Sequence, residues 1–127
     1  MKASRLLLDT HVFLWWRSAP NRILPTVREA IAHADIVFVS AASAWEAAIK
    51  SALGRLRLPA SFESGVAESG FERLPVAFSH AEQVANLPHH HRDPFDRMLV
   101  AQAQIEKLTL VTHDKSFESY DVQLIWT

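Results

Sequence analysis

The sequence predicts an α/β fold built on a mostly parallel sheet. Short runs rich in Leu, Val and Ile recur along the chain, and longer segments with helical spacing separate them. Strands that alternate with helices are typical of crossover connections between parallel strands. No internal repeat, low-complexity tract or linker interrupts this alternation, so residues 1–127 are expected to form a single domain.

The first part of the chain is expected to contain two strands and three helices. Residues 5–8 are expected to form a strand covered on both faces, because three leucines follow one another at 6–8, and residues 36–39 are a short run rich in β-branched side chains. One helix is expected over 10–17, before a break at 18–21, and a second over 25–34 with Pro25 at its first position. Ser40 or Ser43 can cap a third helix that ends near Gly54.

The rest of the chain continues the alternation after a connector at 56–59. The expected elements are a weaker helix at 61–69, a strand at 72–76, a helix from Ser79 to Leu87, a long helix from Asp93-Pro94 to Lys107, and strands at 108–112 and 122–125. Three consecutive histidines, 89–91, follow Pro88 in a predicted loop. Three adjacent imidazoles in a loop cannot easily face one ion, so we interpret them as a solvated loop rather than a transition-metal site.

The composition excludes several classes of protein. The net charge of −1 with neutral histidines argues against a long basic track for nucleic acid, although a focused site or a basic partner is compatible with it. Because cysteine is absent, disulfides, thiolate nucleophiles and zinc ribbons are excluded. No apolar run approaches the roughly 20 residues of a membrane span, and no signal-peptide cleavage site follows the N-terminal apolar stretch. We therefore expect a soluble, cytoplasmic protein without membrane contact.

Four acidic residues stand where this fold would gather them. Asp9 and Asp114 follow predicted strands, and the carboxyl ends of parallel strands form the usual ligand edge of such a sheet. Glu46 and Asp96 lie in stretches that read as first turns of helices. Clustered carboxylates repel one another unless a cation or protons compensate them. Since hard cations prefer oxygen ligands, the cluster predicts a Mg²⁺ or Mn²⁺ site.

Each acid also has a simpler interpretation. Asp9 and Asp114 could cap the turns that follow them, and Glu46 could form a helical ion pair with Lys50. We favour metal binding for all three. For Asp9 the reason is the presence of the other acids, for Asp114 its place on the same sheet edge, and for Glu46 its apolar surroundings on the helix.

Asp93 and Asp96 need separate treatment. Asp93 before Pro94 is a strong helix cap, so a capping role and a direct catalytic role both stay open for it. Asp96 lies in the first turn, has less to do structurally, and is the better ligand. The hydroxyls of Thr10 and Thr112 could assist the metal's water shell or bond their own backbone. The aromatic run of Phe13, Trp15 and Trp16 could form a subunit interface or ordinary core.

Together these residues resemble a PIN domain, specifically a VapC-type toxin of a toxin–antitoxin pair. The matching stretches span nearly the whole chain: LLLDTHVFLWW (6–16), SAASAWEAAIK (40–50), HRDPFDRMLVAQA (91–103) and LTLVTHDKSF (108–117). The resemblance implies a three-layer α/β/α sandwich, Mg²⁺- or Mn²⁺-dependent endoribonuclease activity, inhibition by a cognate antitoxin protein, and frequent homodimers. The family's acidic quartet carries over to Asp9, Glu46, Asp96 and Asp114. Asp93 is an extra acid in the DPFD form of the third motif, which leaves open whether Asp93 or Asp96 binds metal directly. If Asp96 does, Asp93 would act through a ligand or bind a second ion.

The resemblance also implies a mechanism. Metal held by the quartet would activate water for in-line attack on an RNA phosphodiester, leaving a 5′-phosphate and a 3′-hydroxyl. Lys50 or Arg97 could hold a neighbouring phosphate. Two other readings are a non-catalytic module whose acidic pocket receives basic side chains of a partner, and a phosphatase acting on a small substrate.

Overall fold

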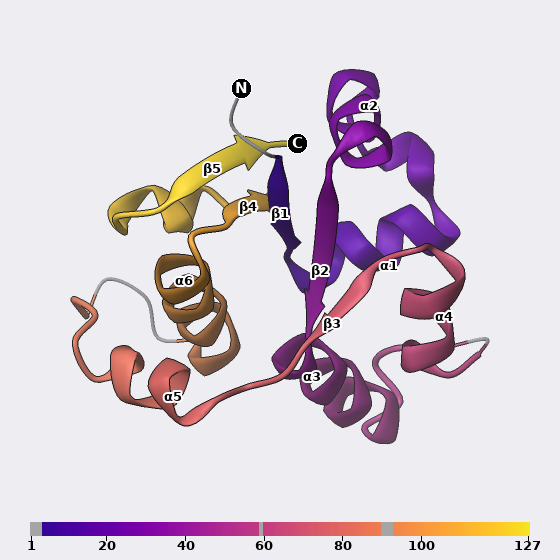
Figure 1. The fold of residues 1–127 in the computed structure, drawn as a ribbon. Helices are drawn as coiled ribbons and strands as arrows, with labels where there is room; N and C mark the ends of the chain where they lie inside the picture. Colours follow the sequence, from indigo (N-terminus) through magenta and orange to yellow (C-terminus); the bar gives the residue numbers. More distant parts are fainter. Residues whose placement is uncertain (1–3, 59, 90–92) are drawn as a thin grey trace.

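The computed structural model describes residues 4–58, 60–89 and 93–127 and shows one five-stranded, fully parallel sheet (Figure 1). The strand order is β3-β2-β1-β4-β5. The strands are β1 (Arg5–Leu8), β2 (Ile36–Ser40), β3 (Glu72–Leu74), β4 (Thr109–Thr112) and β5 (Gln123–Trp126). The helices are α1 (Thr10–Ser18), α2 (Pro25–His33), α3 (Ala41–Ala52), α4 (Phe62–Glu68), α5 (Phe78–Val84) and α6 (Pro94–Glu106), with 3₁₀ turns at Pro20–Arg22 (η1) and Lys115–Ser119 (η2).

Helices cover both faces of the sheet, so the predicted three-layer α/β/α architecture is confirmed. Successive residues of a strand point to opposite faces, and β1 illustrates this. Leu6 and Leu8 pack into a core that includes side chains of α1, α2 and α4, while Leu7 packs into a second core with side chains of α6. Figure 1 shows α1 and α2 on one side of β1 and α5 and α6 on the other. The two cores explain why β1 is apolar at three successive positions.

The strand order reverses beside β1. After β1 the chain adds β2 and β3 on one side of it, and then returns to add β4 and β5 on the other. The backbone N–H of Asp9 donates to the carbonyl of Val111 at 3.0 Å, so the carboxyl ends of β1 and β4 are held together. Ligand sites of open α/β sheets form at such a switch point.

The predicted elements are confirmed, with boundary shifts that have local causes. Ser40, not Ser43, caps α3, so Glu46 lies in the second turn of that helix and not the first. The predicted Ser79 cap of α5 is wrong. The helix begins at Phe78 with Ala77 as its N-cap, and the His80 ring, three residues after the cap, accepts the backbone N–H of Ala77 at 3.0 Å. Among the described helices, none combines the length and apolarity that crossing a bilayer requires.

Candidate active site

Five carboxylates line one cavity of about 160 Å³ at the carboxyl edge of the sheet. They come from the end of β1, from α3, from the start of α6 and from the turn after β4. The lining residues are Asp9, Thr10, His11, Glu46, Lys50, Asp93, Asp96 and Asp114. The four predicted ligands are therefore brought together, with Asp93 as a fifth acid.

Asp9 both caps a helix and belongs to the cavity. Its Oδ1 accepts the N–H of Val12, which completes the first turn of α1, and its Oδ2 accepts the hydroxyl of Thr112. The Thr112 hydroxyl in turn accepts the N–H of Asp114 at 3.0 Å. Thr112 thus connects two acids that are far apart in the sequence, and its accessory role at a metal stays a prediction.

The carboxylate of Glu46 is buried and held by two donors. Thr10 donates to its Oε1 at 2.6 Å, and the Lys50 ammonium lies 2.9 Å from its Oε2. A hydroxyl has one hydrogen, so the 2.9 Å contact between the hydroxyls of Thr10 and Ser43 is one in which Ser43 donates. The i,i+4 pair with Lys50 therefore exists, but on a buried carboxylate facing the cavity rather than on a solvated face.

Asp93 and Asp114 also cap the helical turns that follow them. Asp93 is the N-cap of α6, because its Oδ1 accepts the N–H of Phe95 at 2.9 Å and that of Asp96 at 3.3 Å. Asp114 is likewise the cap of η2, accepting the N–H of Ser116 at 2.9 Å and its hydroxyl at 2.8 Å. Capping and cavity lining thus coincide in three acids, Asp9, Asp93 and Asp114.

The crowding of negative charge is strongest at Asp96. Burial, together with the neighbouring carboxylates of Asp93, Glu46, Asp9 and Asp114, raises the pKa of Asp96 to about 8. Burial also raises the pKa of Asp9, against the lowering effect of its hydrogen bonds from Thr112 and Val12. A bound cation would therefore stabilise the charged form of both carboxyl groups in place of their protons.

The donor set suits a hard cation, although its members are not closed around one. Mg²⁺ and Mn²⁺ prefer oxygen ligands, and carboxylates supply them. Across the ranges that the structure describes, no three acidic or histidine side chains converge closely enough to hold an ion as they stand. Mutual repulsion opposes convergence, and protein donors occupy oxygens of Asp9 and Glu46. An ion would have to draw these carboxylates together.

Arg97 is not among the residues that line the acidic cavity. Its guanidinium donates to the carbonyls of Pro88 at 2.7 Å and Val84 at 3.0 Å, and it lies 3.3 Å from the hydroxyl of Tyr120. These contacts tie α6 to the end of α5. Of the two predicted phosphate-binding residues, only Lys50 lies at the cavity.

The predicted histidine loop and aromatic run have different outcomes. His89 is exposed in a bend, while His90 and His91 lie outside the described residues. In the aromatic run, Phe13 is 2% exposed in the core, and Trp15 and Trp16 pack partly buried against that core. The core interpretation therefore accounts for Phe13 and for part of both indoles.

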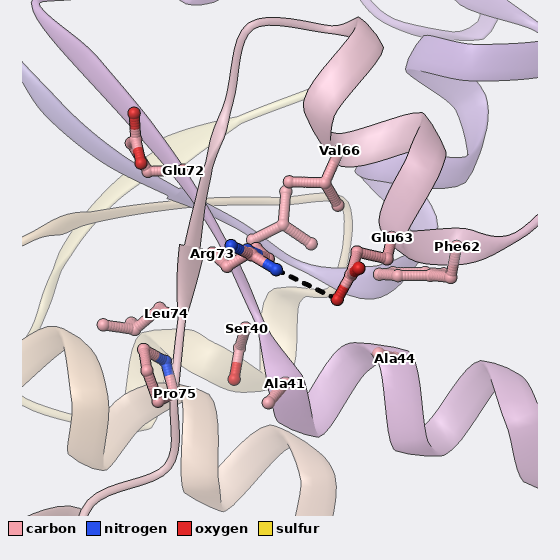
Figure 2. A pocket seen from close by; sticks show the side chains of 11 residues that line it. Ser40, Ala41, Ala44, Phe62, Glu63, Val66, Glu72, Arg73, Leu74 and Pro75 are labelled. Carbon is pink, nitrogen blue, oxygen red and sulfur yellow. Dashed lines mark ion pairs between the residues drawn. The ribbon is translucent and has the colours of Figure 1, made fainter.

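A larger cavity of about 430 Å³ lies between α3, α4 and β3 (Figure 2). Apolar side chains such as Val66 and Leu74 line it, and the ion pair between Arg73 and Glu63, 3.1 Å long, lies beside it. Both charged side chains are mostly exposed. Since a solvated ion pair offers little chemistry, we place the candidate active site at the smaller, acidic cavity.

Two contributors to the site were not anticipated. Ser43 supports Thr10 from the first turn of α3, and His11 lines the cavity beside Asp9. Ser43 had been considered only as a cap, and its spacing of three from Glu46 places both on one helix face. That spacing was the available signal. For His11 the signal was its place in the first turn after Asp9.

Comparisons with known proteins agree with this geometry. The PIN domain family model matches residues 6–123. Ribonuclease VapC22 of Mycobacterium tuberculosis is 31% identical over 118 residues, which cover 91% of each chain. In the structure of VapBC2 from Rickettsia felis bound to a DNA fragment from their promoter, a chain with 15% identity matches with a TM-score of 0.72, covering 94% of this chain and 96% of that one. A chain of FitAcB from Neisseria gonorrhoeae, with 23% identity, matches with a TM-score of 0.65 over 94% and 96% of the two chains. The protein belongs to the PIN domain family and is similar to VapC-type ribonucleases.

Proposed function

We propose that this protein is a Mg²⁺- or Mn²⁺-dependent endoribonuclease that acts as the toxin of a toxin–antitoxin pair. The single observation that carries the proposal is that Asp9, Glu46, Asp93, Asp96 and Asp114 line one cavity at the switch point of the sheet. Similarity to a relative named Ribonuclease VapC22 supports RNA as the substrate. Neighbours that are toxin–antitoxin complexes support an antitoxin partner.

The chain's own residues suggest how the site is organised. Asp9, Glu46, Asp96 and Asp114 would hold the ion, with Asp93 fixing the start of α6 behind Asp96. A bound divalent ion would supply charge neutralisation for the scissile phosphate and activation of water. Thr112 and Thr10 orient Asp9 and Glu46, and Lys50 would move from Glu46 to a neighbouring phosphate. Hydrolysis would leave a 5′-phosphate and a 3′-hydroxyl.

The test is cleavage of single-stranded RNA in Mg²⁺ or Mn²⁺, with a chelator as the metal-free condition. Asp9→Asn and Asp96→Asn should abolish cleavage and keep the fold, because each change removes charge but little volume. Glu82→Gln is the matched control, since Glu82 is an exposed carboxylate on α5 outside the cavity. If both cavity variants cut RNA at the parent rate in Mn²⁺, the assignment of these carboxylates is wrong.

A protein-binding module is the alternative that the acidic cavity also allows. Its carboxylates would then receive basic side chains of a partner instead of metal. Calorimetric titration separates the two functions, because the nuclease should bind Mn²⁺ through the cavity and lose that binding in Asp9→Asn. Absence of binding at millimolar metal would favour the module. A homodimer and a cytoplasmic location also stay predictions, testable by light scattering and by cell fractionation.

A further inference from the structure

Four side chains with planar groups form a row that begins at the acidic cavity, two of them on α1, one in η1 and one just after β4. His11 lines the cavity, and the Trp15 ring lies one helical turn further, 6.3 Å from the His11 ring. His113, the residue before Asp114, packs edge-on against Trp15 at 5.1 Å. The guanidinium of Arg22 lies over the Trp15 ring, 4.7 Å from its centre. We call His11, Trp15, His113 and Arg22 the planar row.

The planar row is accessible and held in place. His11, Arg22 and His113 are exposed, and Trp15 is partly exposed. Nδ1 of His113 lies 2.7 Å from the main-chain oxygen of Thr127, which can only accept, so this nitrogen carries the hydrogen. The ring of Trp15 is contacted by both His113 and Arg22. A surface that is ordered before binding loses less entropy when a ligand arrives.

Electrostatics indicates what this row would bind. The cavity concentrates negative charge and the whole chain has a net charge of −1, so attraction by charge alone cannot hold an RNA strand there. Stacking on aromatic rings does not depend on net charge, because every base has a π-face, and arginine adds a cation–π contribution. Trp15 packs in part against the core, and the groups that contact its ring from other elements are the imidazole of His113 and the guanidinium of Arg22. Both kinds of group stack on unpaired bases in complexes with single-stranded RNA.

We propose that the planar row stacks bases of single-stranded RNA next to the phosphodiester that is cleaved. This inference rests on the proposed ribonuclease function and adds the source of substrate affinity. Trp15 is the centre of the row. The guanidinium of Arg22 lies over its ring and offers its own plane to a base, His113 meets the ring edge-on, and His11 leads the strand towards the cavity. These residues are binding residues, distinct from the carboxylates that would hold the ion.

The experiment is a double-mutant cycle between Trp15 and individual bases. The probe is a fluorescein-labelled single-stranded RNA of mixed sequence that the parent protein binds, and a series of its copies each with one abasic position. Binding is followed by anisotropy in Ca²⁺ without turnover, and cleavage in Mn²⁺. Trp15→Ala should weaken binding of the intact RNA between about 5-fold and 150-fold, the range for loss of one stacked base. It should raise KM far more than it lowers kcat.

The cycle makes the result specific to stacking. At one or two abasic positions the parent should bind the abasic RNA more weakly than the intact RNA. At those positions Trp15→Ala should bind both RNAs with the same affinity. Trp15→Phe should recover part of the affinity, and Arg22→Gln should weaken binding without disturbing the core. Phe78→Ala is the control, because Phe78 is an aromatic residue that is 89% exposed on α5, outside the planar row. Thermal unfolding of each variant identifies any loss of fold. If Trp15→Ala does not fold, Trp15→Phe and Arg22→Gln replace it in the test.

Several outcomes would overturn the planar row. One is an equal loss for Trp15→Ala at every abasic position. Another is parent-like RNA binding by Arg22→Gln or by a folded Trp15→Ala. A third is that the variants weaken binding of a partner protein or of a second copy and leave RNA binding unchanged. Absence of RNA binding by the parent would overturn it too. A parent protein that binds RNA with the expected coupling but never cleaves it would contradict the proposed function and leave the stacking role standing.

Discussion

The hydroxyl of Thr10 donates a hydrogen bond of 2.6 Å to Oε1 of Glu46, which joins the first turn of α1 to the second turn of α3. Both side chains are buried, with 4% and 5% of their surface exposed. A buried carboxylate must be compensated by donors. The Thr10 hydroxyl is one donor to Glu46, and the Lys50 ammonium is another. The bond therefore orients Glu46 towards the cavity.

Replacing Thr10 by valine should reveal this contribution. Thr10→Val keeps the shape of the side chain but removes the donor, so the free energy of unfolding should fall by about 1–2 kcal/mol in metal-free buffer. Affinity for Mn²⁺ should fall too, because Glu46 loses its orientation. Urea denaturation and calorimetry measure the two effects. Thr10→Ser retains the hydroxyl and should stay close to the parent. Parent-like stability and Mn²⁺ affinity in Thr10→Val would show that the bond is dispensable.

Asp93 and Asp96 should respond differently to the loss of charge. Asparagine is as good a helix cap as aspartate, so Asp93→Asn should keep the stability of the protein, whereas Asp93→Ala should lose about 1 kcal/mol. If Asp93 acts mainly through the cap, Asp93→Asn retains measurable RNA cleavage, while Asp96→Asn abolishes it. Initial rates in Mn²⁺ and thermal unfolding separate the two roles. Complete loss of cleavage in Asp93→Asn would make Asp93 a direct ligand.

The sequence predicted what depends on local pattern. Short apolar runs identified the strands because a sheet covered on both faces requires apolar residues at successive positions, as in Leu6, Leu7 and Leu8. The same pattern placed Asp9 and Asp114 at the ends of β1 and β4. Arg97 shows what local pattern does not reveal. Nothing in its sequence surroundings indicates that its guanidinium donates to carbonyls of another helix and of the loop that follows it.

Arg97 should therefore be a stability determinant. Arg97→Lys keeps the charge but cannot reproduce the several donors of a guanidinium, so the contacts to Pro88, Val84 and Tyr120 would be lost in part. We expect a loss of about 1–3 kcal/mol in the free energy of unfolding, with little change in KM for RNA at temperatures where the variant is folded. Lys50→Gln provides the contrast, with a raised KM and a smaller loss of stability. A higher KM in Arg97→Lys at full stability would restore the phosphate-binding prediction.

The metal-free protein should become less stable as pH rises, because the buried carboxyl group of Asp96 loses its proton. The pKa of Asp96 is near 3.8 in the unfolded chain and is raised to about 8 in the fold, so between these values the folded protein holds a proton that the unfolded chain releases. This contribution to stability is fully present below about pH 4 and is lost as pH rises towards about 8. One proton corresponds to a slope of at most about 1.4 kcal/mol per pH unit, and the partial exposure of Asp96 reduces it.

Metal should reverse this dependence on pH. Since Mn²⁺ would replace the proton of Asp96, its affinity should rise with pH up to about 8 and its binding should release a proton. Urea denaturation across this range, and calorimetry in buffers of different ionisation enthalpy, measure the two effects. Asp96→Asn has no proton to lose, so its stability without metal should vary less with pH and its residual metal binding should release fewer protons. Identical pH slopes in the parent and in Asp96→Asn would mean that the excess proton resides on another group, of which buried Asp9 is the first to test.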